Sequence, residues 1–262
     1  MSFCCEICWE EFLLNIQDSP LFAHVTEELS GDIHTQSFWR KFLDGSSLRD
    51  AHQSFYDNLL DPCAKNEHKE CMMEAINSIS FFHDQIKLRV NHINFILSDI
   101  DLVHTAQQKL RFISGRYSWR YNEGIDLGKI SIDVYRYMMN NGGNESDLSG
   151  HVTWQSMWSG NSEVVKYLIA TDEIKKLNLP EKTLGQFAAG ACLSENGAAC
   201  VAAFCEAGLC SRDTLQKSIN EWIQTTKEDD DDDDDELPEL RKNLAELIEK
   251  NYICGSEVCY KI

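Results

Sequence analysis

The side chains best suited to chemistry are thiols, since the chain holds 11 cysteines. Cys5 and Cys8 form a Cys-x2-Cys pair near the N-terminus, and with Cys63, His68 and Cys71 they offer the sulfur and imidazole ligands of a tetrahedral zinc site. The 54 residues between Cys8 and Cys63 have a helical pattern, however, and small buried thiols also pack as hydrophobes. We therefore expect no resident metal and no cofactor, and name Cys5, Cys8, His68 and Cys71 as the candidate ligands if a metal binds.

Two other reactions of cysteine stay open. Cys4, Cys5 and Cys8 lie beside aromatic residues where S-acylation is conceivable, although the nearby carboxylates oppose contact with an anionic membrane. A cysteine nucleophile with a histidine base is the main enzymatic possibility, but 11 Cys and 8 His leave the pairing undecided, so no catalytic residue is assigned. The alternative function is a cysteine-dependent hydrolase or transferase with its chemistry in the N-terminal half.

The charge of the chain limits its partners. Lys and Arg number 24 against 43 Asp and Glu, a net charge of −19, which disfavours nucleic acid because that binding depends on cations that neutralise phosphates. A basic protein surface is the expected partner. Part of this charge is one run of aspartates: Asp229, Asp230, Asp231, Asp232, Asp233, Asp234 and Asp235. The run is interpreted as a solvated loop, and docking of a basic partner is its functional alternative.

Helices are the elements predicted to position these residues. The chain has only four prolines, each expected at a helix boundary, and apolar residues recur at spacings of three and four from Met73 to Leu97. No segment sustains a strand-like alternation with hairpin turns. The predicted fold class is all-α, with residues 1–115 as a helical N-terminal domain.

A repeat of about 33 residues marks the second half. Similar segments begin at Asp133, Glu163 and Ala199, which are 30 and 36 residues apart, and a fourth begins at Lys242. The fourth follows the third by 43 residues, and the excess of ten equals the length of residues 227–236, which contain the aspartates. The acidic segment is therefore predicted to be a loop inserted into a repeat.

These repeats resemble the ankyrin family. Glu163–Leu168 is similar to the family's second helix, Thr183 with the pair Ala188-Ala189 to its first helix, and Glu206–Gly208 to its helix exit. None of the prolines occupies the family's Thr-Pro position, and the usual His is missing. The resemblance covers about residues 125–252 and implies that residues 116–262 form a short ankyrin-like α-solenoid.

The resemblance also implies a function in protein binding. Trp154 and Trp158 would lie on or near the first helix of a repeat, where aromatic side chains serve as binding anchors or else fill the core. We name Trp154, Trp158, Asn161 and the aspartate run as the candidate partner-binding residues. The expected function is a scaffold that presents an acidic ankyrin-like surface to a protein partner.

The predicted location depends on two signals that we do not find in the sequence, a transmembrane segment and a secretory signal. No apolar stretch is long enough for a transmembrane helix, and the N-terminal residues do not form a secretory signal. The expected location is cytoplasmic. The resemblance extends this to a microbial or viral protein acting in the cytoplasm of a host cell.

Overall fold

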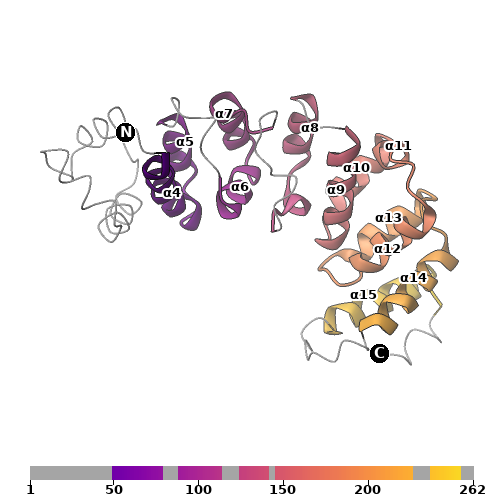
Figure 1. Cartoon of the computed structure of the whole chain (residues 1–262). Coiled ribbons are helices and arrows are strands. Elements are labelled where there is room, and N and C mark those ends of the chain that lie inside the picture. Colours follow the sequence, from indigo (N-terminus) through magenta and orange to yellow (C-terminus); the bar gives the residue numbers. More distant parts are fainter. Residues whose placement is uncertain (1–48, 79–87, 114–123, 142–144, 227–236, 255–262) are drawn as a thin grey trace, which may run out of the picture. The chain divides into compact units, whose positions relative to one another are not determined.

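The computed structural model describes residues 49–78, 88–113, 124–141, 145–226 and 237–254, and in these ranges the protein is all-α. They contain twelve α-helices, one 3-10 turn and no strand (Figure 1). The chain divides into two compact units, residues 1–125 with 136–142 and residues 126–135 with 143–262. The sequence-based prediction of an all-α fold class is confirmed for the described residues.

In the first unit, the described residues before α8 (Ile132–Asn140) form two pairs of helices. They are α4 (Arg49–Lys65) with α5 (Lys69–Ser78), and α6 (Val90–Leu97) with α7 (Ile100–Leu110). Helix α4 packs on α6 and α5 packs on α7, so the pairs contact each other first helix to first and second helix to second. The apolar stripe predicted from Met73 to Leu97 is thus divided between α5 and α6, and Asp99 caps the start of α7 by accepting from two backbone N–H groups.

Pro62 corrects one expectation. It lies inside α4 rather than at a boundary of that helix. The position is tolerated because it falls in the last turns, where the missing N–H removes a single helical hydrogen bond. The carbonyl of Pro62 accepts from both the backbone N–H and the side-chain amide of Asn66, which closes this end of the helix.

The second unit repeats the same arrangement over a longer stretch. Its elements are the turn η2 (Leu127–Lys129), the first residues of α8 (Ile132–Asn140), α9 (Glu145–Trp158), α10 (Ser162–Ala170), α11 (Glu173–Lys176), α12 (Glu181–Ala191), α13 (Gly197–Glu206), α14 (Arg212–Thr226) and α15 (Leu237–Glu249). Helix α12 packs on both α9 and α14, and α13 packs on both α10 and α15. First helices therefore contact first helices, and second helices contact second helices.

Small side chains make this close packing possible. A Cβ atom on Gly185 in α12 would lie 2.6 Å from Oγ of Ser218 in α14, which is closer than Cβ atoms approach other atoms in protein structures. Ala188, Ala191 and Ala198 are each 1 % exposed or less. Because these positions carry little or no side chain, neighbouring helix backbones approach each other and share one apolar core.

Second helices recur along the chain at a nearly constant spacing. Five of them begin at Lys69, Ile100, Ile132, Ser162 and Gly197, at intervals of 31, 32, 30 and 35 residues. Side-chain hydrogen bonds follow the same spacing in both units. Examples are His92 with Asp61, 31 residues apart, and Asn161 with the carbonyl of Gly128, 33 residues apart.

Candidate partner-binding surface on helix α9

Two tryptophans form the apolar part of the candidate surface. Trp154 and Trp158 lie one turn apart on α9, and their side chains are 40 % and 42 % exposed. They are the large hydrophobic side chains that the described residues leave exposed. Their rings meet edge to face, with centroids 6.1 Å apart and an angle of 64° between the planes. An exposed pair of this size is typical of an interaction site, because Trp is enriched among residues that dominate binding energy.

Gly190 of α12 holds the indole of Trp158 in place. A Cβ atom at Gly190 would lie 2.4 Å from Cε2 and 2.5 Å from Nε1 of Trp158. The indole therefore lies directly against the backbone of α12, in space that any other residue would fill. A partner that binds this ring has little side-chain freedom left to remove, which lowers the entropic cost of association. We call Trp154, Trp158 and Gly190 the tryptophan corner.

Asn161 makes hydrogen bonds that join elements next to helix α9. It caps α10, because its Oδ1 accepts from the backbone N–H of Val164 at 3.3 Å. Its Nδ2 donates to the carbonyls of Gly128 at 2.8 Å and Ile130 at 3.2 Å. The amide of Asn161, which is predicted to bind a partner, makes all three of these hydrogen bonds within the fold.

Charges on the neighbouring helices are mixed rather than acidic. Lys182 of α12 lies 3.8 Å from the carboxylate of Glu221 on α14, and Lys217 lies 3.9 Å from the same group. The described residues hold 17 Lys and Arg against 23 Asp and Glu, a net charge of −6. Residues 227–236 alone contribute −8. The predicted binding residues Asp229 to Asp235 lie outside the described residues.

The candidate metal ligands are only partly described. Cys5 and Cys8 lie outside the described residues, His68 is half-buried, and Cys71 in α5 is 1 % exposed. The thiol of Cys63 donates to the carbonyl of Leu59 in its own helix, at 3.4 Å. In the described part of the chain, no three His, Cys, Asp or Glu side chains are grouped closely enough to hold a metal ion.

Three cysteines of the second unit, Cys192, Cys200 and Cys210, are buried. Burial raises the pKa of Cys192, Cys200 and Cys210 to about 12 in each case, so their thiols remain protonated near neutral pH. Cys192 also donates to the carbonyl of Ala188, at 3.6 Å. These side chains contribute packing to the second unit.

The sequence did not predict a carboxylate–imidazole pair in the first unit, formed by a buried histidine and a part-buried aspartate. His92 is fully buried, and its Nε2 lies 2.7 Å from Oδ1 of Asp61. The backbone N–H of Arg89 donates to Nδ1, so the proton of the ring is assigned to Nε2. Partial burial raises the pKa of Asp61, but hydrogen bonds from His92 and Asn91 and the Arg89 charge outweigh it, and the pKa is lowered. Both ring nitrogens are engaged, so the pair joins α4 to α6 and has no free position to act as a base.

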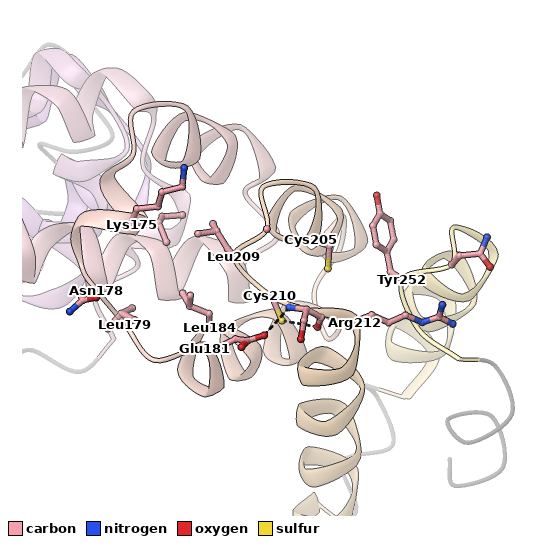
Figure 2. A pocket seen from close by; sticks show the side chains of 14 residues that line it. Lys175, Asn178, Leu179, Glu181, Leu184, Cys205, Leu209, Cys210, Arg212 and Tyr252 are labelled. Carbon is pink, nitrogen blue, oxygen red and sulfur yellow. Dashed lines mark hydrogen bonds between the residues drawn. The ribbon is translucent and has the colours of Figure 1, made fainter.

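The second unit also contains an open cavity of about 680 Å³, shown in Figure 2. Leu184 and Leu209 belong to its apolar lining, and Glu181 and Arg212 to its polar lining. Hydrogen bonds from the side chains of Ser211 and Thr214 and from the backbone N–H of Ser211 lower the pKa of Glu181. The bonds from the Ser211 N–H and the Thr214 hydroxyl both end on Oε1 and link the start of α12 to the start of α14.

Comparison of the chain with protein-family models, curated protein sequences and solved structures finds no match. Among the helices of the described residues, none is long and apolar enough to cross a membrane. The feature of the described residues that best indicates a function is therefore the tryptophan corner.

Proposed function

We propose that this chain is a protein-interaction module in which an ankyrin-like stack of helix pairs presents helix α9 to a partner with a basic contact surface. The single observation that carries the proposal is the exposed pair Trp154 and Trp158, held in place against the backbone of α12. Two exposed indoles do not stabilise a surface that contacts only water. On a binding surface they provide a large and rigid contact area.

The arrangement of the helices supports the ankyrin-like part of the proposal. First helices contact first helices and second helices contact second helices, as expected when each pair buries its apolar face on the next. The spacing of 30 to 35 residues between second helices agrees with the family's period of 33. The first unit has a similar spacing and the same pattern of contacts within itself, so we propose that it too is built from ankyrin-like helix pairs.

The net charge supports a basic partner. A charge of −19 attracts cationic surfaces and accelerates their encounter, while it repels nucleic acids and a second copy of the chain. Because residues 227–236 supply much of this charge, they are proposed to assist the encounter, while the indoles provide the short-range contacts. Such binding weakens as salt is raised.

The proposal is tested by affinity capture from cell lysate with three forms of the full chain: wild type, the double variant Trp154→Ala/Trp158→Ala, and Gln224→Ala. Gln224 is exposed on α14 and serves as the matched surface control. We expect a stoichiometric partner to be captured by the wild type and the control, to weaken at moderate salt, and to be lost from the double variant. Equal capture by the double variant, with unchanged helical circular dichroism, would refute the proposal.

A further inference from the structure

We infer that the tryptophan corner receives an arginine side chain of the partner. This inference rests on the proposed function, and it names the chemical group that the surface recognises. It depends on the shape of the corner, on the way Trp158 is held, and on the charge of the chain.

The two indoles are arranged to leave aromatic surface open. Rings at 64° with centroids 6.1 Å apart meet edge to face, so they do not cover each other as a parallel stack would. Both side chains remain about two-fifths exposed in this arrangement. Within the described residues the indoles pair with each other, and no Lys or Arg of that part of the chain stacks on them. The open ring surface is therefore available to a cation from outside.

Gly190 makes the corner rigid on one side. Three atoms of the Trp158 indole would lie within 2.8 Å of a Cβ at this position, so the ring lies against bare backbone. Contact with α12 fixes the orientation of the ring before any partner arrives. A fixed aromatic ring is a better receptor for a planar group than a mobile one, because less freedom is lost on binding.

Charge and shape together select arginine. The net charge of −19 opposes an acidic partner and a second copy of the chain, and it favours a cation at an exposed aromatic group. Trp provides the strongest cation–π attraction of the aromatic residues. Between the two basic side chains, the guanidinium is planar and weakly hydrated and stacks on an indole, whereas the ammonium of Lys is compact and strongly hydrated.

The experiment uses small probes, so it does not require the partner. N-acetyl-arginine amide and its citrulline counterpart have nearly the same shape, but only the first carries a charge. Each is titrated into the full chain while the indole N–H resonances are followed by NMR, with Trp154→Phe and Trp158→Phe used to assign the two signals. We expect saturable shifts of both signals with the arginine probe, and binding roughly fivefold weaker or absent with citrulline.

Two glycine variants test the role of the corner's geometry. Gly190→Ala keeps both tryptophans but displaces the ring of Trp158, and we expect the arginine probe to bind severalfold more weakly. Gly150→Ala is the matched control, because it lies on the same helix as the tryptophans and a Cβ there meets nothing within 4 Å. It is expected to leave probe binding unchanged.

The outcomes separate this inference from the proposed function. Equal shifts with both probes, or no saturable shift with either, overturn the arginine inference even when the double tryptophan variant loses its partner in the capture experiment. If Gly190→Ala loses binding of the arginine probe and Gly150→Ala keeps it, the result supports recognition by the tryptophan corner. If the arginine probe binds and the double variant still captures the partner, the corner binds cations but the proposed function is wrong.

Discussion

Replacing Asn161 tests whether neighbouring helix pairs are joined by specific hydrogen bonds. In Asn161→Ala, α10 loses its N-cap, which costs about 1 kcal/mol. Two donations from the amide are also lost, each contributing about 1 kcal/mol. The carbonyl of Gly128 keeps a donor in the hydroxyl of Ser159, at 2.9 Å, so only the carbonyl of Ile130 is left without this partner. The expected loss in the free energy of unfolding is therefore about 2–3 kcal/mol.

Asn161→Asp separates the two roles of this side chain. Aspartate caps a helix as well as asparagine does, so a residue that acted only as a cap would tolerate the change. Here the carboxylate would face two carbonyl oxygens and donate nothing to either, and we expect a loss of about 1–2 kcal/mol or more. Both variants are compared with Asn140→Ala, an exposed position in α8 where a change within about 0.5 kcal/mol is expected.

Urea unfolding followed by circular dichroism provides the measurement, with a lower midpoint at unchanged slope as the expected signature. The reasoning fails if Asn161→Ala unfolds at the midpoint of Asn140→Ala. It also fails if Asn161→Asp is as stable as the wild type, since the hydrogen bonds to the preceding loop would then contribute nothing measurable.

Three further predictions concern packing, acid stability and thiol reactivity. Gly160→Ala should cost about 2–5 kcal/mol and Gly208→Ala only about 1–2 in urea unfolding, because both have positive φ but a Cβ meets a backbone oxygen at 1.9 Å only at Gly160. Asp61 has a pKa below its ordinary value of 3.8, so its stabilising contribution is complete above that pH and is lost as the pH falls through the lowered pKa. Asp61→Asn should therefore flatten the decline in stability below about pH 4, measured as unfolding midpoints across pH. Iodoacetamide labelling read by peptide mass spectrometry should modify exposed Cys254 in the native protein and Cys192 only after unfolding; native labelling of Cys192 would contradict its burial.

The helical fold could be predicted because it depends on patterns that a sequence displays directly. Apolar residues at spacings of three and four predict helices, and the recurring segments at Asp133, Glu163 and Ala199 each fall on a second helix, in α8, α10 and α13. The spacing of the first unit was not detected. It is maintained there by pairs such as His92 with Asp61, whose residue types do not recur in the second unit. Helices can therefore recur at a constant spacing while the residue types change, and such a spacing cannot be recognised from sequence similarity between the segments.

The candidate site was only partly predictable, for a related reason. The spacing of Trp154 and Trp158 places them on one face of a helix, but a sequence alone does not distinguish an exposed face from a buried one. The position of the Trp158 ring also depends on Gly190, which lies 32 residues after Trp158 and provides space rather than a contact group. The hydrogen bonds of Asn161 could not be predicted either, because its amide bonds to a loop 31 to 33 residues earlier in the sequence.

Asn161 and Gly190 both affect how neighbouring elements of the second unit pack. Each acts between neighbouring helix pairs: the amide of Asn161 fixes the loop before α8 to the start of α10, and the missing side chain of Gly190 lets the ring from α9 lie on α12. Under the proposed function, neither residue needs to touch a partner to affect binding, because each contacts an element next to the tryptophans. Gly190→Ala therefore has a direct consequence for recognition: it should weaken partner capture while helix content stays unchanged. Unaltered capture by this variant would show that the partner binds the tryptophans without needing the ring of Trp158 in a fixed position.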